Sequence, residues 1–235
     1  MSQVTIHAST PLDAWQQGAV RLLSSQGELF NLLTIVCDPC APSHDALLKH
    51  SPHHVRLDAD NATDVSNTIF PQSVFERSGT REELYSRYLS IHDRARRMRP
   101  GKQAWGTYFE RLLRFPESNV NQLERAISKL NSWPQRNTTG LVFHLSAPTV
   151  DAPRTRGGPC WHFGEILWHG DETLDLVVVY RNHDYFNKVL GNFVGLGRLL
   201  SFVCSATGKR TGKLVCHSVH AYHDSTKTQL QQLIK

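Results

Sequence analysis

Long apolar runs are missing from this chain of 235 residues. No stretch approaches the roughly 18 apolar residues that a membrane-spanning helix needs, so we expect no membrane partner. The segment from Met1 to His7 has no basic region followed by an apolar core, and we expect no secretory signal there. Cysteine is also scarce, because an odd count of five in a chain of this length favours reduced thiols. These absences predict a cytoplasmic protein.

A strong excess of one charge is missing as well. Charged residues make up 20% of the chain and hydrophobic residues 40%, which allows a packed core and argues against wholesale disorder. The net charge of +5 is a weak sign of an anionic ligand. Much of the excess lies in one basic run: Arg87, Arg94, Arg96, Arg97, Arg99 and Lys102. This run has no interleaved aromatics or nucleic-acid-binding motif, so a solvated helix face is the simpler interpretation and a phosphate or nucleic-acid contact the alternative.

The pattern of apolar residues predicts the secondary structure. We expect helices over residues 14–23, 80–98, 105–115, 120–130, 184–206 and 226–234. We expect strands over residues 30–37, 140–146, 161–168, 174–180 and 213–222, with 161–168 and 174–180 joined as a hairpin. Residues 38–80 give no clear assignment. With no internal repeat and no long linker, we expect one α+β domain over residues 1–235, a mixed sheet packed with helices around one long central helix.

One cysteine stands at the start of a predicted strand. Cys160 follows Gly157-Gly-Pro159, and Arg181 comes 21 residues later at the end of the next strand. If the two strands are neighbours, Arg181 would favour the thiolate of Cys160, which is the nucleophilic form of cysteine. The alternative is a buried core cysteine, the commonest place for a free thiol.

Further polar groups stand at the ends of the predicted core elements. Asn192 lies inside a long apolar helix, where a buried amide must be hydrogen-bonded to protein or ligand. Its amide could match the O4 and N3–H edge of uracil, and a bond between helices is the alternative. His220 and Tyr222 lie two residues apart and share one face of a strand. They are candidates for ligand binding, or simply a half-buried pair that faces solvent.

Four motifs within residues 139–224 resemble thymidylate synthase in order and spacing. They are Gly158-Pro-Cys160, Tyr180-Arg-Asn-His-Asp184, Leu190-Gly-Asn192-Phe-Val-Gly-Leu196 and His220-Ala-Tyr222. The form is similar to the short synthases described from archaea. Residues 1–138 match the family only loosely. The resemblance implies a thymidylate synthase-like fold and a homodimer.

The resemblance also implies roles for the site residues. Cys160 would be the nucleophile that adds to C6 of a pyrimidine. Arg181 would hold the nucleotide phosphate and help ionise Cys160, because a guanidinium stays charged and forks onto phosphate. Asp184 would orient the folate and contact the base. The other residues in these motifs would bind the substrate: Asn182, Asn192, His220 and Tyr222. The cofactor would contact Gly191 as well as Asp184.

The implied reaction transfers a one-carbon unit. The expected partners are a pyrimidine nucleoside monophosphate of the dUMP or UMP kind and 5,10-methylenetetrahydrofolate or a related pterin. Thiolate addition at C6 makes C5 nucleophilic, which splits one hard step into easier ones. A 5-methyl product is expected, and Asn192 favours uracil over cytosine. The alternatives are a 5-hydroxymethyl product, a modified nucleotide for another pathway, or a non-catalytic nucleotide-binding module.

Several positions depart from the family pattern. Arg136 is one arginine where the family has a pair, and we expect it to reach a partner subunit's site. His162 stands one place beyond the usual histidine, so strand alternation would point it to the opposite face. The chain also ends thirteen residues after Tyr222, which would leave the folate side less shielded from water. Glu76 and Glu82 are candidates for the proton-relay glutamate.

The remaining cysteines are weaker candidates. Cys37-Asp-Pro-Cys40 could bind zinc with nearby histidines, but the spacing matches no full zinc motif, and we expect no metal. The histidines concerned are His44, His50, His53 and His54. Cys204 and Cys216 lie in apolar elements, which predicts core positions.

Overall fold

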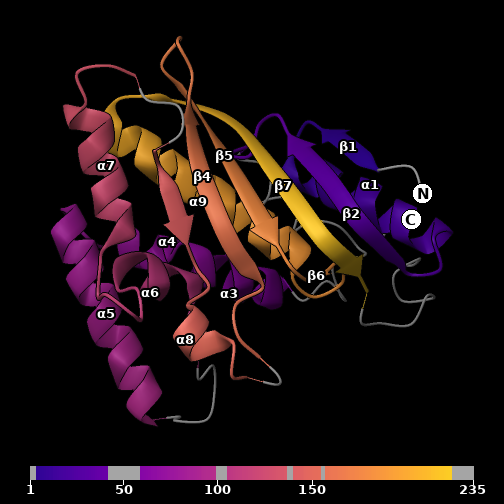
Figure 1. Cartoon of the computed structure of the whole chain (residues 1–235), viewed down its shortest axis with the longest axis horizontal. Coiled ribbons are helices and arrows are strands. Elements are labelled where there is room, and N and C mark those ends of the chain that lie inside the picture. The colour runs from indigo at the N-terminus through magenta and orange to yellow at the C-terminus, as the bar shows by residue number, and fades with distance from the viewer. Residues whose placement is uncertain (1–3, 42–58, 99–104, 137–139, 155–156, 224–235) are drawn as a thin grey trace.

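A mixed sheet forms the centre of the protein in a computed structural model that describes residues 4–41, 59–98, 105–136, 140–154 and 157–223 (Figure 1). The sheet has seven strands in these residues, in the order β1-β2-β7-β5-β4-β3, with β6 paired to β7. The strands are β1 Thr5–Ala8, β2 Glu28–Val36, β3 Val142–His144, β4 Trp161–Trp168, β5 Thr173–Tyr180, β6 His183–Asp184 and β7 Arg210–Tyr222. The sheet contains both parallel and antiparallel pairs, which confirms the α+β class with a mixed sheet.

Helices cover the sheet and extend beyond its β3 edge. They are α1 Pro11–Ser24, α3 Ala59–Ile69, α4 Gln72–Phe75, α5 Arg81–Met98, α6 Tyr108–Leu113, α7 Gln122–Ser132, α8 Pro148–Asp151 and α9 Val189–Thr207. The helices expected at 14–23, 80–98, 105–115, 120–130 and 184–206 are confirmed, although α6 and α9 are shorter than predicted. The helix expected over 226–234 lies outside the described residues.

The longest helix, α9, is the core helix of the fold. By length and composition it could cross a membrane, which the sequence analysis did not anticipate, but 78% of its apolar window is buried inside the protein. Small residues let α3 approach it closely. A Cβ atom at Gly191 would lie 2.6 Å from the carbonyl oxygen of Ala62, and one at Gly195 would lie 2.8 Å from that of Ser66. Glycine is therefore required by the packing of α3 on α9.

The sheet brings the sequence motifs to one end. β4 runs antiparallel to β5, so Trp161 pairs with Tyr180, and β5 runs parallel to β7, so Tyr180 pairs with Ser218. β6 continues the same end of β7, where Asp184 pairs with Tyr222. The beginning of β4 and the ends of β5 and β7 thus meet at the lower edge of the sheet in Figure 1.

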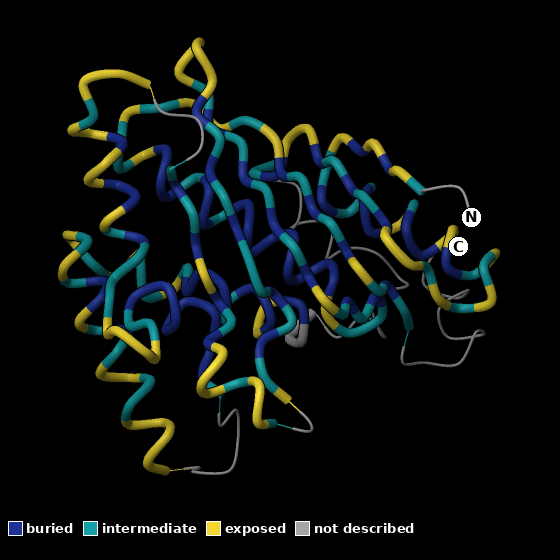
Figure 2. Tube along the Cα trace, viewed as in Figure 1, coloured by how far each residue is buried: buried dark blue, intermediate teal, exposed yellow. Residues whose placement is uncertain are grey.

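The two faces of the sheet differ in burial. Along β5 and β7, buried residues alternate with half-buried or exposed ones (Figure 2). The buried set faces α9. On the other face, the partly exposed set is largely apolar and includes Leu33, Ile35, Val177, Val179 and Val215. Register places these residues next to one another, because Val177 pairs with Val215, which in turn pairs with Ile35.

Candidate active site

Cys160 is held at the entrance to β4 by backbone contacts. Gly157 and Gly158 have φ angles of +82° and +92°, values that favour glycine. The carbonyl oxygen of Cys160 accepts a hydrogen bond of 2.9 Å from the backbone N–H of Arg181. The Tyr108 hydroxyl oxygen accepts bonds from the backbone N–H groups of Cys160 at 3.2 Å and Trp161 at 3.3 Å. Contacts from α6 and from the end of β5 therefore hold the backbone of Cys160 in place.

Arg181 lies beside Cys160, as the hairpin predicted. Its Nε donates to the carbonyl oxygen of Pro159 at 3.1 Å, and its Nη2 donates to that of Gly157 at 3.1 Å. These bonds use two of the five N–H donors of the guanidinium. Arg181 thus holds the loop that carries the cysteine and brings a permanent positive charge to it.

The thiol of Cys160 is harder to ionise than the sequence suggested. Burial raises its pKa above the ordinary value, and this outweighs the effect of Arg181, which lowers it. Asp184 also raises the pKa, while Lys188 lowers it. The charges act as expected for a cysteine between a cation and an anion. Arg181 therefore favours the thiolate, as predicted, but desolvation by burial leaves the pKa of Cys160 raised.

Asp184 anchors the turn that leads into α9. Its Oδ1 accepts hydrogen bonds from the backbone N–H groups of Phe186 at 3.0 Å and Asn187 at 3.2 Å, and its Oδ2 accepts one from the Asn187 side chain at 2.8 Å. The carboxylate remains partly exposed. It therefore positions the start of α9 while contributing negative charge at Cys160.

The amide of Asn192 finds a partner that the sequence analysis did not name. Asn192 is 4% exposed, and its Nδ2 lies 3.1 Å from Nε2 of His183 in β6. His183 is itself 1% exposed, and its Nδ1 lies 2.8 Å from Oγ of Ser218 in β7. The hydrogen bond joins α9 to the sheet, rather than to another helix.

His220 and Tyr222 share one face of β7, as predicted. Their rings stack at 5.4 Å, and Phe30 stacks on His220 from the other side at 4.9 Å. The imidazole bonds to Oδ1 of Asn182 through Nδ1 at 2.8 Å and to Oε2 of Glu28 through Nε2 at 3.1 Å. The structure therefore links Asn182 and His220 directly, two residues that the resemblance assigns to substrate binding.

Comparison with known proteins shows sequence similarity over part of the chain. No family model matches the chain. A Methanococcoides burtonii protein with the name "Putative thymidylate synthase" is 29% identical over 131 residues, 55% of this chain and 58% of that protein. Proteins of the same name from Methanosarcina mazei and Methanosarcina barkeri are 28% and 25% identical, again over 55% of this chain and 58% of each relative. The match thus covers just over half the length of these curated relatives. Over these residues the chain is similar in sequence to proteins named as putative thymidylate synthases.

Two further residues implied by the thymidylate synthase resemblance lie away from Cys160. Arg136 is next to Gly170 in the β4–β5 turn, where a Cβ atom would lie 3.1 Å from its Nη1. The eight residues of β4 separate this turn from Cys160, a distance of roughly 25 Å at about 3.3 Å per residue. Arg136 is therefore not part of the site in its own chain. Gly191 faces α3, so packing explains this glycine, and its cofactor-binding role stays a prediction.

His162 lies at an irregularity in the pairing of β4 with β5. Trp161 pairs with Tyr180 while Phe163 pairs with Val179, which leaves His162 in a β-bulge. Burial and then the charge of Arg181 lower the pKa of His162. Strand alternation across this bulge therefore does not fix the face to which His162 points, and that orientation stays a prediction.

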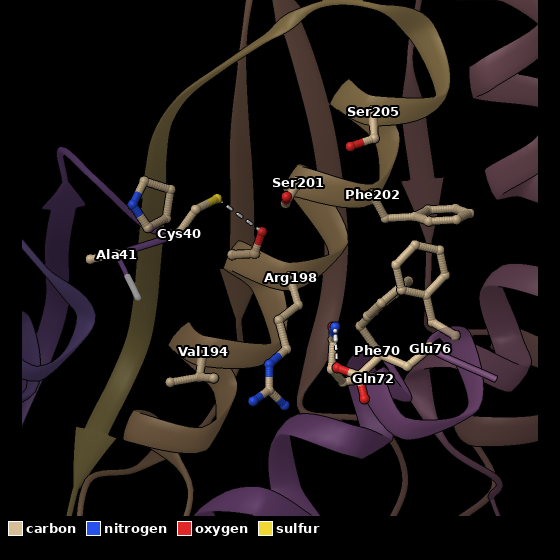
Figure 3. Close-up of a pocket in the computed structure, with 13 residues that line it drawn as sticks. Cys40, Ala41, Phe70, Gln72, Glu76, Val194, Arg198, Ser201, Phe202 and Ser205 are labelled. Atoms are coloured by element: carbon tan, nitrogen blue, oxygen red, sulfur yellow. Dashed lines mark hydrogen bonds between the residues drawn. The ribbon is translucent and has the colours of Figure 1, made fainter. Parts of the chain in front are cut away.

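The other cysteines and the candidate glutamates lie elsewhere. Figure 3 shows Cys40 and Glu76 at a separate cavity of about 270 Å³ against α9. The Sγ of Cys40 donates to the carbonyl oxygen of Gly197 at 3.3 Å, and burial raises its pKa to about 11, which disfavours metal binding. Glu82 is exposed in the first turn of α5. The histidines near Cys40 lie outside the described residues. All five cysteines are free, as predicted, and Cys204 and Cys216 are buried.

Proposed function

We propose that this protein transfers a one-carbon unit to C5 of a pyrimidine nucleoside monophosphate of the uridylate kind, giving the 5-methyl product. The observation that carries the proposal is the placement of Cys160 beside Arg181 at the sheet end that also holds Asn192. A nucleophile, a phosphate-binding cation and an amide able to pair with a base are the parts that this chemistry needs. The similarity to proteins named as thymidylate synthases supports the same assignment.

Each of the three residues has a separate role in the proposed reaction. The Cys160 thiol loses its proton, and its sulfur forms a bond to C6 of the base, which moves electron density to C5 and O4. Arg181 binds the phosphate and offsets the negative charge of the thiolate. Asn192 binds the edge of the base. After C5 gains the one-carbon unit, C5 loses its proton to solvent, the bond between sulfur and C6 breaks by elimination, and Cys160 leaves as the thiolate.

Methylenetetrahydrofolate is the proposed co-substrate and would supply both the one-carbon unit and the hydride that completes a methyl group. Of the two residues predicted to bind it, Asp184 offers a partly exposed carboxylate. Gly191 is buried against α3. The folate would therefore contact this chain through Asp184 and the turn that Asp184 anchors.

The test is release of tritium from C5-labelled deoxyuridylate in the presence of methylenetetrahydrofolate, with the product identified by mass. We expect tritium in water and a 5-methyl product, and neither with Cys160→Ala. A product heavier by one oxygen would assign hydroxymethyl transfer instead. Nucleotide binding without tritium release would assign a non-catalytic binding module and contradict the proposal.

We also propose that the protein is a cytoplasmic homodimer in which Arg136 serves the site of the other subunit. Arg136 is too far from Cys160 to act in its own chain. The partly exposed apolar face of the sheet, with Leu33, Val177 and Val215, offers a surface that a second copy would cover. Each site would then contain residues of two chains.

A further inference from the structure

The ring of His183 is locked in the core next to the site. Tyr180 stacks on it at 4.2 Å with an interplanar angle of 9°, and Phe193 meets it edge-on at 5.8 Å. Burial lowers the pKa of His183 to about 3. The imidazole is therefore neutral at physiological pH, with one nitrogen that donates a hydrogen bond and one that accepts.

The neighbours of His183 decide which nitrogen carries the hydrogen. The amide nitrogen of Asn192 lies 3.1 Å from Nε2 of His183 and can only donate a hydrogen bond. Nε2 of His183 therefore accepts, and the ring hydrogen is on Nδ1 of His183. Nδ1–H then donates to the Oγ of Ser218 at 2.8 Å. The Oγ of Ser218 in turn lies 4.0 Å from the Sγ of Cys216. The hydrogen bonds therefore run in one direction, from Asn192 through His183 to Ser218.

This direction matters because a side-chain amide can bind two kinds of base. The O4 and N3–H of uracil present an acceptor and a donor, and the N4–H and N3 of cytosine present the same pair in reverse order. Rotating the amide of Asn192 by half a turn exchanges its oxygen and nitrogen. An asparagine side chain that can rotate freely could therefore form both hydrogen bonds with either base.

We propose that His183 is a specificity-determining positioning residue, whose accepting Nε2 holds the Asn192 amide in the single orientation that matches uracil and excludes cytosine. The inference rests on the proposed function, because it takes Asn192 to be the residue that contacts the base. His183 itself touches no substrate. It acts by removing the second orientation of the amide.

Two variants separate this role from simple packing. His183→Phe keeps a flat ring for the stack on Tyr180 but has no acceptor, whereas His183→Gln keeps an acceptor oxygen. Deoxyuridylate and deoxycytidylate binding is measured for each folded variant and the wild type. We expect wild type to prefer deoxyuridylate, His183→Phe to lose about fivefold of that preference, the worth of one hydrogen bond, and His183→Gln to retain more of it. An unchanged preference in folded His183→Phe overturns the inference while leaving the proposed function in place.

A measurement on the wild-type protein avoids the risk that a core variant fails to fold. Nitrogen NMR of labelled histidine distinguishes a protonated from an unprotonated ring nitrogen. We expect His183 to show Nδ1–H and an unprotonated Nε2 at neutral pH. A hydrogen on Nε2 would mean that Asn192 presents its oxygen to His183, and it would overturn the inference whatever the enzyme does. Wild type that binds neither nucleotide would instead overturn the proposed function, and the inference with it.

Discussion

At the scale of the residue, the ionisation of Cys160 is set by burial against two cations and one anion. Burial raises its pKa, and Arg181 and Lys188 lower it, while Asp184 raises it further. Removing a cation should therefore raise the pKa, and removing the anion should lower it. The thiol is mostly protonated at neutral pH in the ligand-free protein.

The pH dependence of Cys160 alkylation by iodoacetamide tests this balance, because only the thiolate reacts. We expect the alkylation profile to lie at higher pH than for an ordinary cysteine. Arg181→Ala should move the profile up, Lys188→Ala should move it up by less, and Asp184→Asn should move it down. A downward shift in Arg181→Ala would show that the charges do not act on the thiol as described.

His183 makes the protein sensitive to acid. Its pKa is about 3 in the folded protein and ordinarily about 6.5 in an unfolded chain. The unfolded chain therefore binds a proton first, and the stability that the neutral ring contributes above pH 6.5 is lost as the pH falls from 6.5 towards 3. At pH 5 the loss is about 2 kcal/mol by this linkage.

Urea unfolding at pH 7 and pH 5 measures the effect of His183. The decrease in unfolding free energy should be smaller in His183→Phe than in wild type. The exposed His7 serves as a control, since His7→Gln should leave the decrease as it is in wild type. Equal decreases in wild type and His183→Phe would rule out the buried neutral imidazole as the cause.

At the scale of the element, the packing of α3 on α9 depends on glycine. The carbonyl oxygens of Ala62 and Ser66 occupy the space that a methyl group at Gly191 or Gly195 would need. Gly191→Ala and Gly195→Ala should each cost about 1–3 kcal/mol, the usual range for overpacking a core. Gly79→Ala, at an exposed position with 3.5 Å of space, is the matched control and should change little. Denaturant midpoints measure all three, and tolerance of both core substitutions would contradict the packing.

The helices and strands also show which parts of the fold the sequence could predict. The hairpin of β4 and β5 was predictable because two apolar runs of strand length flank a short turn, and this placed Cys160 beside Arg181. The helix α3 was not, because its sequence is rich in Asp, Asn and Thr, and contact with α9 rather than intrinsic propensity holds it.

Long-range contacts at the site were also hidden from the sequence. Tyr108 reaches the backbone of Cys160 from 52 residues away. The role of His183 depends on the pairing of β6, a strand of two residues that no periodicity indicates. The place of Arg136 at the far end of β4 became clear only from the path of the chain.

At the scale of the whole molecule, the proposed homodimer predicts sites shared between subunits. Arg136→Ala and Cys160→Ala should each be inactive alone. When the two variants are mixed under conditions that exchange subunits, hetero-dimers should contain one site with both residues intact, and activity should return to about a quarter of wild type, since half the dimers are mixed and each has one good site. No recovery from a mixture that demonstrably exchanges subunits would contradict the sharing of Arg136.

The central claim is that Cys160 attacks a pyrimidine nucleotide, and one measurement tests it directly. The protein is incubated with 5-fluoro-deoxyuridylate and methylenetetrahydrofolate, and its intact mass is recorded. The account predicts a covalent adduct with the mass of nucleotide plus folate in wild type and in Cys37→Ala, whose substitution removes an exposed thiol, and no adduct in Cys160→Ala. An unmodified wild-type protein, or an adduct that persists in Cys160→Ala, would contradict it.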